Sequence, residues 1–187
     1  MAAGDLTTLA NVKAYLSPPL TATTDDALLG RLITAASQFI QSWINATIAQ
    51  AGYSETRNGN GGTLLFLRNR PVTAVASVLV DGVAIAASNP APMGAGFLFD
   101  DNAIYLKGYA FSKGAQNITV QYTAGYATTP PELEQACIAL VCLRYKERDR
   151  IGQASKSLAG ESASFQPKDM PPDVATVLDQ YRNLVPV

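Results

Sequence analysis

The chain has 187 residues, of which 48% are hydrophobic, and a formal net charge of −1. This is enough for one domain with a real core, alone or with an appendage. The near-zero charge excludes the strong positive field with which proteins bind nucleic acid or anionic membranes nonspecifically. The sequence has no histidine, so the commonest general base and zinc ligand are both missing and an enzyme is less expected.

The N-terminus, MAAGDLTTLANVKAYL, has no basic start followed by an apolar run, so we expect no secretory signal and synthesis in the cytoplasm. No apolar run is long enough to span a bilayer, and we expect no membrane partner. Cys137 and Cys142 lie on one expected helix and point apart, so we interpret them as small core residues. No metal-ligand spacing is present, and the sequence predicts no metal, cofactor or catalytic residue.

Two helices are expected at the start of the chain. Residues 6–16 have apolar side chains on one face, and Ser17-Pro18-Pro19 ends this pattern. The next start signal is TTDD at residues 23–26, where a threonine would cap the free amides. Helical spacing then continues, so we expect one long helix to about residue 51, with Leu32, Phe39 and Trp43 in the core.

The middle of the chain, at about residues 53–124, predicts a small antiparallel sheet inserted between helices. Asn58-Gly59-Asn60-Gly61-Gly62 separates two strand-like segments and indicates a hairpin, and Asp81-Gly82 indicates a second turn. The expected strands are residues 53–57, 63–67, 75–80, 83–85, 97–99, 103–106 and 117–123.

The stretch VQYTAGYATTPPELEQACIAL, residues 120–140, turns from a strand into a helix at one corner. We expect Tyr122 and Tyr126 in the core and a long helix from Pro130 to about Arg150. Its segment ACIALVCL, residues 136–143, is apolar on every side and needs more cover than one stripe. The sheet and the other helices, or a neighbouring subunit, could supply that cover.

The end of this helix is charged. Arg144, Lys146, Arg148 and Arg150 alternate with Glu147 and Asp149, so the net field is small. The cluster is interpreted as a solvated helix end or as a polar rim that contacts a neighbouring subunit or lines a channel, rather than as a nucleic-acid site.

The remaining segment predicts a flexible loop at residues 152–170 and a short helix from Pro172 to Tyr181. The expected fold is therefore α+β and mainly helical. It has a long N-terminal helix, an inserted antiparallel sheet, a long helix after the AGY corner and a short C-terminal helix.

Two pairs of carboxylates, Asp25-Asp26 and Asp100-Asp101, could serve a small histidine-free enzyme. A helix start and a turn explain them better, because adjacent side chains rarely converge on one point.

The order of these motifs resembles the phage head–tail connector family, also called head–tail adaptors. The resemblance covers residues 1–150 and rests on LRNRPV at 67–72, VASV at 75–78 with Asp81-Gly82, VQYTAGY at 120–126 and PPEL at 130–133. The N-terminal pieces LxxVKxxL at 9–16, DDALL at 25–29 and LIxAA at 32–36 also contribute.

The resemblance implies a structural virion protein that forms a ring of about twelve copies in the neck. The ring would join the portal to the tail or stopper and extend the channel through which DNA passes without specific binding. It implies a subunit interface that includes Ile138, Val141, Arg144 and Arg148. Residues 151–187 would be a portal-docking tail, with Val174, Val177, Leu178 and Tyr181 as its contacts. A stopper or another neck protein, a small enzyme and a monomeric binding module remain as rivals.

Overall fold

A computed structural model describes residue 2 and residues 4–89, 94–148, 155–158, 161–164 and 170–183. Those residues form four helices and nine strands, and every named sheet is antiparallel. The α+β class is therefore confirmed, but the expectation of a mainly helical chain is wrong because strands are about as common as helices. No helix in the described part is long and apolar enough to cross a membrane.

The chain divides into two compact units. The helical unit combines both ends of the chain, Met1–Asn45 and Thr129–Arg182, and the second unit comprises Ala46–Thr128 with Asn183–Val187. The strands expected at about residues 53–124 all belong to the second unit.

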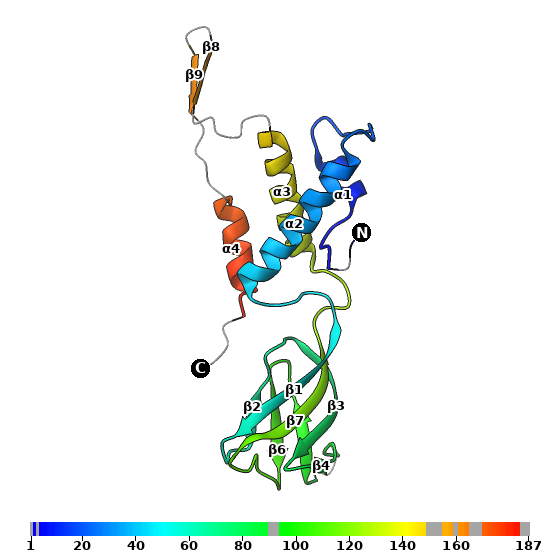
Figure 1. Cartoon of the computed structure of the whole chain (residues 1–187), viewed down its shortest axis with the longest axis vertical. Coiled ribbons are helices and arrows are strands. Elements are labelled where there is room, and N and C mark those ends of the chain that lie inside the picture. Colours follow the sequence, from blue (N-terminus) through cyan, green and yellow to red (C-terminus); the bar gives the residue numbers. More distant parts are fainter. Residues whose placement is uncertain are drawn as a thin grey trace. The chain divides into compact units, whose positions relative to one another are not determined.

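The helical unit contains α1 (Leu9–Tyr15), α2 (Asp26–Ile44), α3 (Pro131–Glu147) and α4 (Pro172–Gln180), shown in Figure 1. The Thr8 hydroxyl caps α1 by accepting the Asn11 N–H at 3.1 Å. Prolines stand in the first turns of α3 and α4, where a missing N–H costs nothing. Since α3 contacts α1, α2 and α4, three helices of this chain surround it.

The long N-terminal helix ends earlier than its sequence pattern predicts. Asn45 takes a left-handed conformation with φ of 54° and caps α2, its N–H donating to the carbonyl oxygens of Gln41 and Ser42. Asparagine tolerates this conformation better than most residues. The predicted threonine cap is also wrong, because Asp25 is the N-cap residue and its side chain caps no amide of the helix.

The buried face of α2 differs from the expected one. Leu29, Ile33, Ala36, Ile40 and Ile44 are buried. The predicted core residues Leu32 and Phe39 are only half-buried, and Trp43 is 39% exposed. Both sets have helical spacing, so periodicity alone did not identify which of the two adjacent stripes turns inward.

The second unit is a β-sandwich. One sheet has the order β1-β7-β3-β4 and the other β2-β6-β5. The two sheets contribute to one hydrophobic core, which includes Val78, Ile104, Phe111, Ile118 and Val120. The strands are β1 (Ala51–Gly59), β2 (Leu64–Phe66), β3 (Val72–Val80), β4 (Val83–Ile85), β5 (Gly96–Phe99), β6 (Ala103–Lys107) and β7 (Gly114–Ala124).

The glycine-rich segment after β1 is not the predicted hairpin. β1 pairs with β7 and β2 pairs with β6, so the segment leads from one sheet to the other. Gly59 donates its N–H to Asn117 Oδ1 at 2.8 Å, and the Gln116 N–H donates to Asn58 Oδ1 at 2.7 Å. These bonds keep the end of β1 on β7. The Asp81-Gly82 turn is confirmed, with positive φ at both residues between β3 and β4.

The central strand β7 alternates buried and less buried positions, as expected for a strand with one face in a core. Tyr122 is buried as predicted, whereas Tyr126 is half-buried. At the corner after β7, Gly125 has φ of 104°, and a Cβ atom there would lie 2.7 Å from the Ala49 carbonyl oxygen. The corner therefore requires glycine.

Two further strands, β8 (Ser155–Leu158) and β9 (Glu161–Ser164), lie inside the segment expected to be a loop and pair only with each other. The expected flexibility of residues 152–170 otherwise concerns positions largely outside the described ones, as do Asp149 and Arg150 at the predicted end of α3.

Candidate functional site

The apolar segment of α3 is covered by its own chain. Leu133, Cys137, Leu140 and Val141 have no exposed surface, and Ile138 is 6% exposed. The helices α1, α2 and α4 supply this cover. Ile138 and Val141, which are predicted to be subunit contacts, are both buried within the single chain.

The two cysteines belong to this core, as predicted. Cys137 Sγ lies 3.6 Å from the Ser37 hydroxyl on α2. Burial raises the pKa of the Cys137 thiol to about 11, and burial also raises the pKa of Cys142. Both are free thiols, and a protonated buried thiol is a poor nucleophile.

The charged end of α3 makes contacts within the chain. The Arg144 guanidinium lies over the Phe39 ring, 5.3 Å from its centre, and Arg148 lies 4.0 Å from the centre of the Tyr145 ring. Arg148 also forms an ion pair with Asp25 at 3.3 Å. The Tyr145 hydroxyl donates to Asp25, and this bond, together with Arg148, lowers the pKa of that carboxyl. These contacts join the end of α3 to the start of α2.

The C-terminal helix packs on the helical unit with part of its predicted portal-docking face. Val174 is 3% exposed and Leu178 is fully buried. The Tyr181 hydroxyl donates to Glu132 Oε2 at 3.0 Å. Val177 remains half-buried. The Trp43 Nε1–H group donates to Asp179 Oδ1 at 3.2 Å, which adds a polar contact between α2 and α4.

Asp25, Asp26 and Asp100 of the two aspartate pairs have side-chain partners. Lys13 Nζ lies 2.7 Å from Asp26 Oδ1. Asp100 Oδ1 accepts the N–H groups of Asn102 and Ala103, each at 2.8 Å, and these bonds contribute to lowering its pKa. Among the described residues, no group of three or more His, Cys, Asp or Glu side chains could hold a metal ion. The arrangement matches a helix start and a turn better than a pair of catalytic carboxylates.

A partly buried polar cluster in the sandwich was not predicted. The Tyr122 hydroxyl donates to Glu55 Oε1 and accepts the Asn69 N–H at 3.2 Å. Glu55 Oε1 also accepts the Arg68 N–H at 3.2 Å. Burial, and then the bond to Glu55, raises the pKa of Tyr122 to about 12. The cluster fixes the LRNRPV segment, and Asn183 reinforces it by donating to the Arg68 carbonyl oxygen at 2.7 Å.

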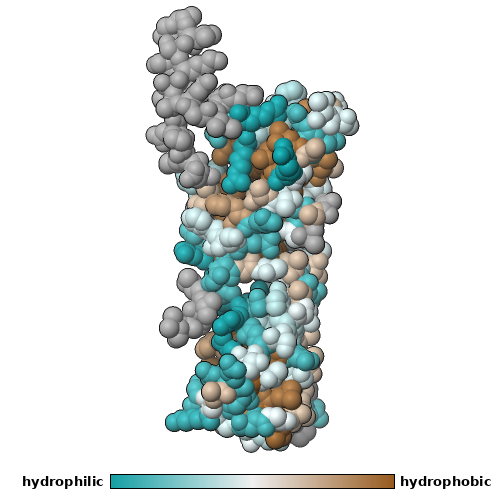
Figure 2. Space-filling model, viewed as in Figure 1, coloured by the Kyte–Doolittle hydropathy of each residue, from teal (hydrophilic) through white to brown (hydrophobic). Residues whose placement is uncertain are grey.

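Several apolar side chains lie at the surface of the sandwich, and Figure 2 shows apolar residues among hydrophilic ones there. Phe66, Val83, Phe99, Tyr105 and Tyr109 are between 42% and 63% exposed.

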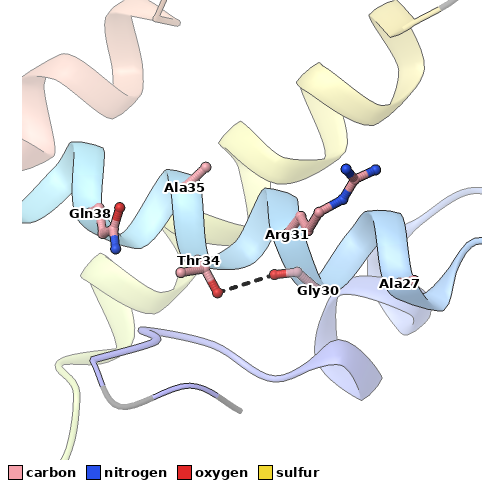
Figure 3. Close-up of a pocket in the computed structure, with 6 residues that line it drawn as sticks. All are labelled: Ala27, Gly30, Arg31, Thr34, Ala35 and Gln38. Atoms are coloured by element: carbon pink, nitrogen blue, oxygen red, sulfur yellow. Dashed lines mark hydrogen bonds between the residues drawn. The ribbon is translucent and has the colours of Figure 1, made fainter.

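Two hollows lie within the helical unit. The first is a shallow depression of about 540 Å³ along the exposed side of α2, shown in Figure 3. The second is a groove of about 610 Å³ lined by residues of α1, α3 and α4. Sequence reasoning missed both. The run of Ala27, Gly30, Thr34 and Ala35 at helical spacing was the available signal for the first.

A family model described as "Head completion protein" matches residues 5–184. No curated protein matches the chain. One similar solved structure is described as "Neck of empty GTA particle computed with C6 symmetry", with a TM-score of 0.62 and 20% identity. A second is "Neck of native GTA particle computed with C12 symmetry", with a TM-score of 0.60 and 17% identity. Each comparison covers 100% of this chain and 94% of the other.

These structural matches show that the whole fold is shared with proteins of such particles. The family model carries the functional conclusion, because it spans nearly the whole sequence, including the LRNRPV segment and the AGY corner. The predicted resemblance to head–tail connectors is confirmed: the chain belongs to the head completion protein family.

Proposed function

We propose that this chain assembles into a closed ring that joins the portal of a tailed-phage-like capsid to the tail or stopper and extends the DNA channel. The observation that carries the proposal is the family match over residues 5–184. The similar neck structures were computed with C6 and C12 symmetry, which supports a ring of about twelve copies.

The proposed role is structural and not enzymatic. Asp25, Asp26 and Asp100 already have partners, and both cysteines are buried. The net charge of −1 suits a channel through which DNA passes, because each phosphate contact would add affinity and slow that passage.

Portal binding is assigned to the C-terminal segment from residue 151. Val174 and Leu178 are buried, so they could contact a portal only if α4 left its place. Val177 and Tyr181 are half-buried, and they remain proposed contacts with α4 in place. Arg144 and Arg148, also half-buried, remain proposed subunit contacts.

The test is native mass spectrometry of the purified chain over a concentration series, alone and with the portal protein of the same particle. A closed ring near twelve copies in either sample supports the proposal. A chain that stays monomeric in both samples contradicts it.

A stopper below the ring is the second candidate. The sandwich favours it, since strands are about as common as helices and stoppers are mostly β proteins. The same experiment separates the two roles: a connector binds the portal directly, whereas a stopper binds only after a connector ring is present.

A further inference from the structure

The groove in the helical unit is apolar inside and acidic at its edge. Ala136, Ala139 and Val177 line it, and Tyr15, which is 54% exposed, stands at its border. Glu132 and Asp173 also line it, from the first turns of α3 and α4. A groove of about 610 Å³ can accept a row of small side chains from another helix.

The charge of this groove has one sign. No lysine or arginine is among its lining residues. Asp173 is exposed and forms no ion pair with any residue that the structure describes. Glu132 accepts a hydrogen bond from the neutral Tyr181 hydroxyl and forms no ion pair within the described part of the chain. The complementary partner is therefore a mostly uncharged surface that carries a cation.

The exposed side of α2 has these properties. Ala27 and Ala35 are exposed, and a Cβ atom at Gly30 would meet nothing within 4 Å. Arg31 is exposed in the same row, and Figure 3 shows its side chain extending away from the helix. No acidic side chain in the described ranges pairs with Arg31.

The Asp5 carboxylate contacts this row at Thr34 and forms no ion pair with Arg31. Asp5 accepts the Thr34 hydroxyl at 3.0 Å and the Ala2 N–H at 2.6 Å. It is thereby held at the edge of the row by local bonds.

In one copy of the chain, α2 and the groove lie on different sides of α3. This helix faces α2 through Cys137 and Arg144, which contact Ser37 and Phe39. It faces the groove through Gln135 and Ala139. A ring needs two such unlike patches, because each subunit presents one patch to the preceding copy and the other to the following copy.

We propose that the exposed side of α2 in one copy docks in the groove between α1, α3 and α4 of the next copy, with Arg31 against Asp173 and Glu132. The proposal rests on the ring proposed above and names its contact surfaces.

Disulfide trapping tests this contact in the full chain. Ala35→Cys and Gln135→Cys place one thiol on each surface, at exposed positions. Under mild oxidation, the double variant should give a ladder of covalent oligomers up to the closed ring. Each single variant should stay monomeric, and a mixture of the two should stop at dimers. The native thiols should not interfere, because both are buried and their pKa values are raised.

The matched control pairs Ala35→Cys with Lys146→Cys, an exposed position at the other end of α3. This variant should form no ladder. A ladder as strong as that of the Gln135→Cys pair would mean that the thiols meet at random, and it would overturn the assignment.

Charge reversal tests the electrostatic part. Arg31→Glu in the double-cysteine background should lower the ladder yield about tenfold, since like charges then face each other across the contact. Adding Asp173→Arg should restore most of the yield. Circular dichroism and Trp43 fluorescence identify any variant that fails to fold. If Arg31→Glu does not fold, Arg31→Gln replaces it and should lower the ladder yield by less than the charge reversal.

The outcomes separate this contact from the ring itself. If the parent chain forms a ring by native mass spectrometry but the cysteine pair gives no ladder, these surfaces are wrong and the ring stands. If the parent chain is monomeric alone and with the portal, and no ladder forms, both proposals fail. If the trapped product is an intramolecular bond, the chain's own segment occupies the groove and the docking of a second copy is wrong.

Discussion

At the residue scale, Gly125 combines two demands that only glycine meets. Its φ is 104°, and an added Cβ atom would lie 2.7 Å from the Ala49 carbonyl oxygen and 2.9 Å from the Gln50 Cα atom. Both obstacles are backbone atoms, so no side-chain rotation relieves them. The corner between β7 and the chain that leads to α3 therefore depends on this one residue.

Gly125→Ala should lower the free energy of unfolding by about 1–3 kcal/mol, because it adds backbone strain and a steric clash. Urea denaturation measures this. Gly52→Ala is the control, since a Cβ atom there meets nothing within 4 Å. Equal stability of the two variants would contradict this account of the corner.

Tyr122 makes the stability of the sandwich change with pH in the alkaline range. Its pKa is raised from 10.0 to about 12, first by burial and then by the bond to Glu55. The folded state therefore holds the phenolic proton more tightly than the unfolded state. This contribution is fully present below pH 10 and is lost as the pH rises toward 12.

Tyr122→Phe should flatten the decline of stability between pH 10 and 12, measured by urea denaturation at each pH. Tyr53→Phe is the control and should keep the decline, because it changes only the tilted ring whose centre lies 5.6 Å from that of Tyr122. A parent chain with no decline in this range would refute the proton linkage.

At the scale of elements, α4 is part of the core of the helical unit. Leu178 is fully buried, and Trp43, the only tryptophan in the sequence, donates to Asp179. The fluorescence of Trp43 therefore reports whether α4 is packed on the helical unit.

Leu178→Ala should cost about 2–5 kcal/mol, as for other buried leucines, and should shift Trp43 emission to longer wavelength if α4 separates. Val177→Ala, at a half-buried position, should cost less and leave the emission unchanged. Deleting residues 171–187 should shift the emission fully and destabilise the helical unit. If the deletion variant kept both the emission wavelength and the stability of the parent chain, α4 would contribute nothing to the helical unit.

The sequence predicted most elements but not how they combine. α1, α3, α4, the Asp81-Gly82 turn and most of the strands follow from local patterns. The hairpin at Asn58–Gly62 was wrong because turn chemistry permits a reversal without specifying which strand pairs with β1. The inward face of α2 was misassigned because Leu32 and Ile33 both fit helical stripes. The groove could not be predicted, since it forms only where three helices from distant parts of the sequence meet.

At the scale of the whole molecule, the sandwich is an insertion in the helical unit. Its first strand and its last strand are neighbours, and Ala51 pairs with Ala124. The chain thus enters and leaves the sandwich at adjacent points. The sandwich also has its own hydrophobic core, which includes residues of both sheets.

A fragment of residues 46–128 should fold alone and unfold cooperatively, as shown by circular dichroism in the far ultraviolet and by dispersed amide resonances. A fragment of residues 46–110 lacks β7, the strand between β1 and β3, and should stay unfolded. An unfolded 46–128 fragment would mean that the sandwich depends on the rest of the chain.

The pairing of Ala51 with Ala124 also makes the sandwich exchangeable. A short glycine-rich link could replace the whole sandwich, because such a link needs to cover only the distance between two neighbouring strands. A fluorescent or affinity domain with adjacent termini could be grafted at the same place. The chain would then carry a label without a cut in any of its helices.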